Sequence, residues 1–189
     1  MFNPRTITLI TMILAAAATR VLPHPWNFTA VGAMCLFGGA TFQRRSLAFI
    51  VPLLALFVSD LVIAFTTYDG DLASMTMFKY SLFGLTVLMG MAIRERANLT
   101  NVLGMSLAAS VMFFLLSNGH YWYTATLYPH TPEGLLTCYI AAIPFAQNML
   151  YANVFYSVVL FGGLHLLQQR WPALANPFAA KLTLAPVRG

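Results

Sequence analysis

The chain has 189 residues, of which 59% are hydrophobic and only 8% charged, and its formal net charge is +5. Soluble globular proteins carry about 25% charged residues, so this composition excludes a soluble protein and predicts an integral membrane protein. The basic residues stand between apolar segments and form no clustered basic face. This pattern argues against a nucleic-acid partner and is typical of membrane topology signals.

The first apolar segment predicts a helix from Thr6 to Leu22. With Arg5 before it and an alanine run at 15–18, the segment could also pass for a secretory signal peptide, but we interpret it as the first membrane helix. The second segment, Phe28–Phe42, contains three glycines and is short for a full span. It is either a tilted, tightly packed helix or a partly re-entrant one.

The third segment, Ser46–Thr67, is the most informative part of the chain. It is about as long as a helix needs to be to cross a bilayer core, roughly 20 residues. Its only charged residue is Asp60. Because a charge at membrane depth is costly, it usually faces the bundle interior or a water-filled cavity. The partner of Asp60 therefore becomes the central question.

Further helices are expected over Leu72–Ile93 and Leu99–Ser117. A polar-aromatic stretch follows, and then an apolar run, Gly134–Leu167, that is too long for one simple span. Proline restricts the residue before it, so we expect Pro144 to divide this run. The prediction is a short surface helix at 134–143 and a sixth membrane helix at 145–168.

The expected fold is an all-α bundle of six transmembrane helices, the second one short. Residues 1–168 form a single domain and residues 169–189 a cytoplasmic interfacial tail. With both termini cytoplasmic, only Arg20 and Lys79 of the ten basic residues lie toward the outside. Such an asymmetry fits the positive-inside rule and predicts a multi-pass protein of a bacterial inner membrane. The basic residues then placed inside are Arg5, Arg44, Arg45, Arg94, Arg96, Arg170, Lys181 and Arg188.

Asp60 and Lys79 are placed symmetrically about the turn at residues 68–71, which predicts nearly equal depths on two antiparallel helices. Arg20 is a second candidate partner. Such a cluster either fixes the packing of three helices or forms the polar floor of an outward-facing ligand cavity. Both alternatives remain open from the sequence, and a proton-relay role is disfavoured because no second membrane acid is present.

The turns on the outer side are rich in rings and include His24, His120 and His130. They form either an ordinary aromatic belt or a lid of stacking groups, from His120 to His130, over a ring-bearing ligand. No HxxxH or HxH spacing supports a bare metal site, so we expect neither a metal nor a cofactor.

The last helix carries Asn148 and Asn153, each three residues before a tyrosine and therefore on one helical face with it. They either bind ligand from the wall opposite Asp60 or form hydrogen bonds between helices. The chain has no nucleophile motif, no zinc-protease motif, no dinucleotide fingerprint and no P-loop, so we predict no enzyme and no ATPase of its own.

Five stretches of the sequence are distinctive: Arg20 to Ala33, Leu36 to Ala40, Ser59-Asp60, Tyr128 to Thr131 and Ala142 to Phe145. Together they resemble an uncharacterised family of small bacterial membrane proteins, which is similar to the S-components of energy-coupling-factor vitamin transporters. The resemblance implies an outward-facing vitamin site and a transmembrane coupling subunit with ATPases, docked through small residues such as those at 15–18.

The leading hypothesis is a membrane transport protein that takes up a small vitamin-like micronutrient, with cobalamin or another tetrapyrrole as a candidate suggested by the histidine-rich outer face. The alternative is a structural or assembly subunit of a larger membrane complex, without a ligand of its own. The expected partners are the lipid bilayer, the small-molecule ligand and the coupling subunit. The predicted ligand-binding residues are Arg20, Asp60, Lys79, Tyr80, His120, Trp122, His130, Asn148 and Asn153.

Overall fold

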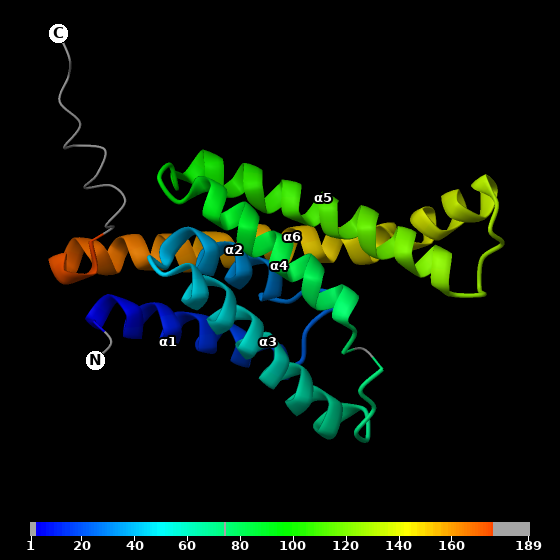
Figure 1. Cartoon of the computed structure of the whole chain (residues 1–189), viewed down its shortest axis with the longest axis horizontal. Helices are drawn as coiled ribbons and strands as arrows, with labels where there is room; N and C mark the ends of the chain where they lie inside the picture. The colour runs from blue at the N-terminus through cyan, green and yellow to red at the C-terminus, as the bar shows by residue number, and fades with distance from the viewer. Residues whose placement is uncertain (1–2, 74, 176–189) are drawn as a thin grey trace, which may run out of the picture.

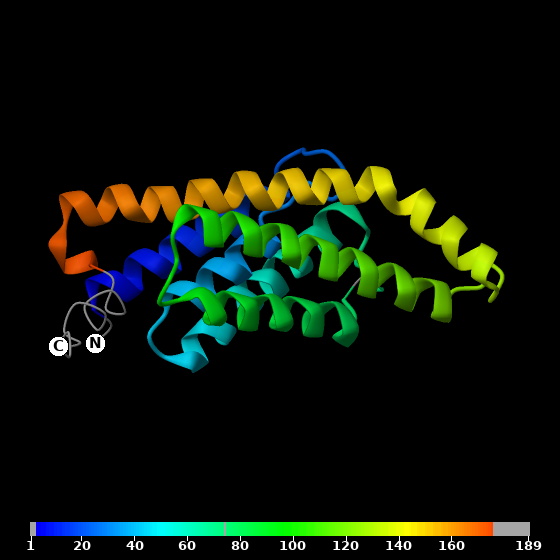
Figure 2. The ribbon, with the colours of Figure 1, turned by 90° about the horizontal axis from the view of Figure 1, so that it is seen from above.

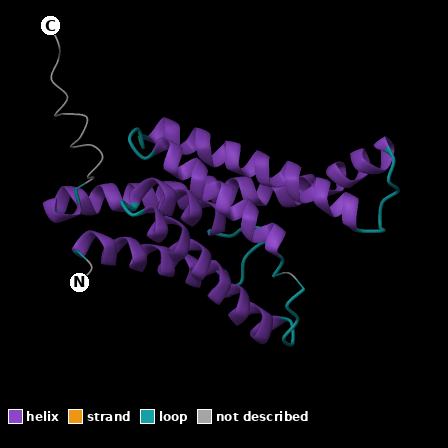
Figure 3. Ribbon diagram, in the orientation of Figure 1, coloured by secondary structure: helices purple, strands orange, loops and turns teal. Residues whose placement is uncertain are grey.

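The computed structural model describes residues 3–73 and 75–175, and within these residues it is helical without strands (Figure 3). Two short 3-10 turns, η1 (Thr19–Val21) and η2 (Pro172–Leu174), follow the first and last helices. Figure 1 shows how the six α-helices are arranged: α1 (Pro4–Ala18), α2 (Val31–Thr41), α3 (Arg45–Thr67), α4 (Met77–Ile93), α5 (Leu99–Thr124) and α6 (Pro132–Arg170).

The short helix α2 lies at the centre of the bundle and packs against all five other α-helices. Every one of its residues except Gly32 is buried, as expected for a helix that is apolar on all sides. At about 1.5 Å per residue, its length falls well short of a bilayer core. Of the two alternatives for this segment, the structure therefore has a short, tightly packed core helix.

Two facing glycines bring the backbones of α2 and α4 into direct contact. A Cβ added to Gly39 would lie 2.1 Å from the carbonyl oxygen of Val87, and one added to Gly90 would lie 2.2 Å from that of Leu36. No side chain other than hydrogen fits at either position. Small residues at such crossings allow the close approach on which helix association in membranes depends.

Three helices, α3, α5 and α6, are long and apolar enough to cross a membrane, while α2 and α4 are shorter apolar helices. The outer face of α3 exposes large apolar side chains such as Ile50, Leu54 and Phe57. An apolar outer surface of this kind indicates a lipid environment. The expected all-α fold with six helices is confirmed, with three helices of full spanning length.

The prediction of two helices separated at Pro144 is wrong. Helix α6 runs without interruption from Pro132 to Arg170, with Pro144 inside it. Its yellow N-terminal part changes direction relative to the rest (Figure 2). A proline inside a helix removes one backbone hydrogen bond and commonly bends the helix without ending it. Helix α5 also extends further than expected, to Thr124 instead of Ser117.

One end of the bundle, here called the basic end, holds Arg5, Arg44 and Arg94. The guanidinium of Arg5 donates to the carbonyl oxygens of Thr41 and Leu174, so the start of α1, the end of α2 and η2 meet there. Arg94 donates to the carbonyl oxygen of Gly39 over 3.0 Å. The remainder of the predicted tail, residues 176–189 with Lys181 and Arg188, lies outside the described residues.

Candidate functional site

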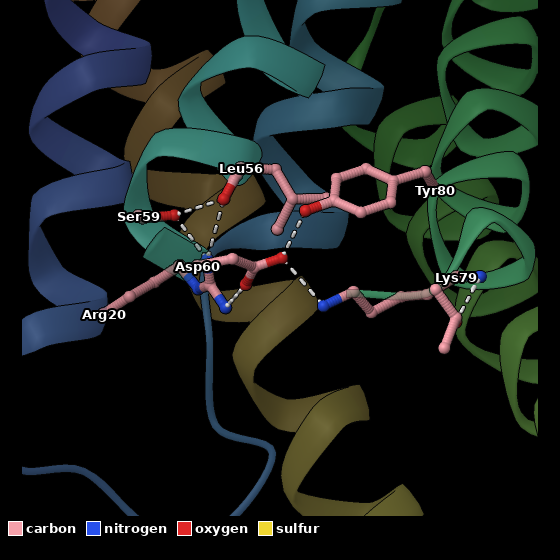
Figure 4. A network of polar contacts seen from close by, with 7 residues as sticks. Arg20, Leu56, Ser59, Asp60, Lys79 and Tyr80 are labelled. Carbon is pink, nitrogen blue, oxygen red and sulfur yellow. Dashed lines mark hydrogen bonds and ion pairs between the residues drawn. The ribbon is translucent and has the colours of Figure 1, made fainter. Parts of the chain in front are cut away.

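The opposite end of the bundle holds a buried polar network centred on Asp60 (Figure 4). Lys79 Nζ and the Tyr80 hydroxyl both donate to Asp60 Oδ2, each over 2.7 Å. Arg20 Nη2 donates to Asp60 Oδ1, also over 2.7 Å, and Arg20 Nη1 donates to the Ser59 hydroxyl. Both predicted partners of Asp60 are confirmed, and the network joins η1, α3 and α4.

Local structure places each member of this network. Arg20 lies in η1, where the chain leaves α1. Lys79 lies in the first turn of α4, and its backbone N–H donates to the side chain of the N-cap residue Thr76. A cation at a helix N-terminus opposes the helix dipole, so the ion pair with Asp60 offsets an unfavourable position. Asp60 lies on the buried face of α3, one helix back along the chain.

The three charges of the network do not cancel. Arg20 and Lys79 contribute +2 and Asp60 contributes −1, which leaves +1 for the cluster. The side chain of Asp60 is 4% exposed, that of Arg20 11% and that of Lys79 23%. The acid is therefore the most enclosed member, and Lys79 is the member most open to a ligand.

A cavity of about 780 Å³ opens beside this network; we call it the wide chamber. Arg20, Asp60 and Lys79 lie on its wall. The segment 21–27, which includes His24 and Trp26, forms another part of the wall. The volume lies within the range of about 300–1,000 Å³ that is usual for small-molecule sites. Asp60 therefore faces a cavity and also fixes the helices around it.

A second cavity of about 180 Å³, the narrow chamber, shares Arg20, Asn27, Thr29 and Lys79 with the wide one. It extends between the helices toward Asn153. Its walls are largely apolar, and the apolar side chains among them are Val31, Leu56, Phe83, Ala109, Phe113 and Met149. The two chambers together offer a polar entrance and an apolar interior.

The two asparagines of α6 have different roles in the structure. Asn153 is buried on the narrow chamber, and its Nδ2 donates to the Ser110 hydroxyl of α5 over 2.7 Å. Asn148 donates from Nδ2 to the carbonyl oxygen of Trp26 over 3.0 Å, which ties α6 to segment 21–27. Asn153 thus forms a hydrogen bond between helices and also lines the narrow chamber. Asn148 does not line either chamber but holds segment 21–27, which is part of the wall of the wide chamber.

The aromatic residues predicted to form a lid lie elsewhere. His120 stacks on Phe78, with 3.8 Å between the ring centroids. Trp122 donates from Nε1 to the carbonyl oxygen of Pro129 and packs edge-on against His130. None of His120, Trp122 and His130 lines either chamber.

The reason for this difference is that α5 continues as a helix through Thr124, so the rings of the 120–130 region pack against Phe78 of α4 and against one another at the end of α5. Segment 21–27 occupies the position expected for the lid. The rings of this segment directly follow Arg20 in the sequence, and this adjacency is the signal that could have identified it. The sequence interpretation also missed Ser59, which accepts a hydrogen bond from Arg20.

Neither cysteine lies on the wall of these chambers; Cys35 is enclosed in α2 and Cys138 is buried in α6. Among residues 3–73 and 75–175, no three His, Cys, Asp or Glu side chains gather in a way that could hold a metal ion. The charged side chains on the walls of the two chambers are Arg20, Asp60, Asp71 and Lys79.

These features define a helical protein with span-length apolar helices, a buried ion-pair network and a two-part cavity at one end. Residues 1–174 match the model of a family of unknown function, DUF6580, and the chain belongs to that family. No curated protein and no solved structure matches the chain.

Proposed function

We propose that this protein binds a small vitamin-like micronutrient in the wide and narrow chambers and serves its uptake across a bacterial inner membrane. The observation that carries the proposal is the wide chamber, about 780 Å³ in volume, with Arg20, Asp60 and Lys79 on its wall. A cavity of ligand size with a few convergent polar groups is the usual form of a small-molecule site. The size also leaves cobalamin or another tetrapyrrole, only partly enclosed, among the ligands to be tested.

The proposed orientation places the basic end in the cytoplasm and the chambers on the outside. Arg5, Arg44 and Arg94 cluster at the basic end, and positive charge is favoured on the cytoplasmic side. A ligand would then enter from outside through the wide chamber. Since the chain carries no P-loop, we further propose that it works with a transmembrane coupling subunit and ATPases, as S-components do.

One observation favours the alternative, a structural or assembly subunit. Both carboxylate oxygens of Asp60 are occupied by donors from Arg20, Lys79 and Tyr80. A carboxylate held through both oxygens in this way fixes helix packing without any ligand. The wide chamber is what distinguishes the two functions, because a purely structural network has no need of a cavity beside it.

Native mass spectrometry of the full chain in lipid nanodiscs tests the proposal. The expected result is a co-purified small molecule, together with a thermal shift by at least one member of a vitamin panel that includes cobalamin. Thr29→Phe, which places a ring where the two chambers meet, should remove both signals. Thr100→Phe at an exposed position of α5 is the matched control. Absence of any retained ligand and of any thermal shift would favour the structural alternative.

A further inference from the structure

The two chambers differ in charge, and the difference bears on the ligand. Among the described residues that line the narrow chamber, Arg20 and Lys79 are charged and none is acidic. Two acids, Asp60 and Asp71, lie on the wall of the wide chamber and not on that of the narrow one. A ligand group in the narrow chamber therefore meets two cations, while both acids face the wide chamber.

Lys79 has hydrogen-bonding capacity left for a ligand. An ammonium group carries three N–H donors, and Asp60 Oδ2 accepts one of them. The ring of Tyr80 lies 5.3 Å from Nζ and contributes a cation–π contact without using a donor in a hydrogen bond. Lys79 lines both chambers and is the most exposed of the three charged residues. It is the group best placed to contact a ligand.

Arg20 contributes charge from a fixed position. Its Nη1 donates to the Ser59 hydroxyl and to the carbonyl oxygen of Leu56, and its Nη2 donates to Asp60. The guanidinium is therefore held by α3, and its Nε is buried. A fixed cation at the edge of an apolar cavity attracts an anion more strongly than it would in water, because the local dielectric constant is lower.

The remaining walls of the narrow chamber select for an apolar body. Leu56, Phe83, Phe113 and Met149 supply aliphatic and aromatic surface. Two polar side chains of its lining already donate to protein groups: Thr86 to the carbonyl oxygen of Leu82, and Asn153 to the Ser110 hydroxyl. A ligand that fills this space gains by burying apolar surface.

From this arrangement we propose that the ligand is a small amphipathic anion. Its negatively charged group, of the carboxylate class, binds Lys79 and Arg20 where the chambers join, and its apolar or aromatic part occupies the narrow chamber. This inference rests on the proposed function and adds the charge and polarity of the ligand. Asp60 then acts as a positioning residue for the two cations and not as a ligand contact.

A matched series of three probes tests the charge requirement: 3-phenylpropionate, its amide 3-phenylpropanamide, and 3-phenylpropylamine. Binding to the full chain is measured by calorimetry near neutral pH, in nanodiscs of zwitterionic lipid so that anionic headgroups do not compete. We expect the carboxylate to bind about tenfold or more tightly than the amide, and the amine to bind more weakly still. Added salt should weaken binding of the carboxylate more than binding of the amide, because the wide chamber is open to solvent and its charges are screened.

Lys79→Met should remove the preference for the carboxylate over the amide, whereas Arg96→Met, an exposed charge at the basic end, should leave it unchanged. The comparison of the three probes on the unmodified chain does not depend on any variant folding. Equal binding of carboxylate and amide, stronger binding of the amine, or binding of none of the three would overturn the anion inference. The proposed function would still stand if native mass spectrometry found a neutral or cationic ligand, and would fall only if none were found.

Discussion

Lys79 Nζ of α4 lies 2.7 Å from Asp60 Oδ2 of α3, across the turn that connects the two helices. The turn itself uses residues that tolerate positive φ, since Asp69 has φ 48° and Gly70 φ 84°. The chain reverses between the end of α3 at Thr67 and the start of α4 at Met77, which brings Lys79 to Asp60, and Arg20 approaches the same carboxylate from η1. The stability of the site end therefore depends on one acid that holds two cations.

Asp60→Asn should destabilise the protein strongly. It leaves Arg20 and Lys79 as two close cations without a compensating charge, and breaking a buried ion pair costs about 3–5 kcal/mol. The free energy of unfolding in mixed micelles with a denaturing detergent measures the loss. Asp69→Asn removes the same charge from an exposed residue and should be nearly neutral.

The double variant Asp60→Asn with Lys79→Met should recover part of this loss, because it removes an uncompensated cation along with the acid. A coupling energy of about 0.5–3 kcal/mol is typical for residues in contact. Strictly additive effects of the two substitutions would show that the pair contributes nothing and would contradict the central role of Asp60.

Gly39→Ala should weaken the packing of α2 against α4. The new methyl group would meet the carbonyl oxygen of Val87, a backbone atom that cannot rotate away, so the helices must separate. Overpacking of this kind costs about 1–3 kcal/mol. The midpoint of thermal unfolding, followed by intrinsic fluorescence in nanodiscs, should fall accordingly.

The matched control is Gly104→Ala, at a helical glycine of α5 with no atom within 4 Å of the added Cβ. It should be neutral or stabilising by up to about 1 kcal/mol, because alanine favours the helix over glycine. If Gly39→Ala were tolerated as well as Gly104→Ala, the α2–α4 contact would not be as close as the structure has it.

The Asp60 cluster could be predicted from the sequence, because a single acid in an apolar helix needs a cationic partner and Lys79 and Arg20 are the candidates on the same side. The start of α4 could not, since the helix begins at Met77 and not at Leu72. The continuous α6 could not, because the effect of Pro144 depends on contacts made elsewhere. The Tyr139 hydroxyl donates to the carbonyl oxygen of Leu115, and this contact holds the first part of α6 against α5 through the bend.

The two cavities could not be predicted from the sequence for a similar reason. Their positions depend on how closely α2 approaches its neighbours, which Gly32 decides on the side of α6: a Cβ there would lie 2.3 Å from Asn153 Oδ1. The prediction of a lid at 120–130 failed because the distance of these rings from Arg20 depends on where α5 ends. A helix end without a strong breaking residue is poorly defined by local sequence.

Arg5→Gln should release the segment after α6. The Arg5 guanidinium donates to the carbonyl oxygens of Leu174 and Ala175, and hydrogen bonds to charged groups contribute about 1.5–3 kcal/mol. The bonds that remain are local ones, such as that from Gln168 Nε2 to the carbonyl oxygen of Leu174. Limited digestion with trypsin, followed by mass spectrometry, should show cleavage after Arg170 accelerated about tenfold or more. Arg96→Gln removes one tryptic site elsewhere and should leave the rate of cleavage after Arg170 unchanged.

Asn148→Ala should loosen segment 21–27, which forms part of the wall of the wide chamber. The lost hydrogen bond to the carbonyl oxygen of Trp26 contributes about 1 kcal/mol, enough to raise local opening several-fold. Hydrogen–deuterium exchange should therefore rise in a peptide that contains residues 22–29, while exchange in α2 stays unchanged.

Gln147→Ala, at the exposed neighbouring position on α6, provides the comparison and should leave exchange at 22–29 as it is. If both variants gave the same exchange as the unmodified chain, Asn148 would not support the wall of the chamber. Since Asn148 lines neither chamber, the effect of its loss on ligand binding should act through this segment: faster dissociation of 3-phenylpropionate with an unchanged preference over the amide. A changed preference would instead place Asn148 in contact with the ligand.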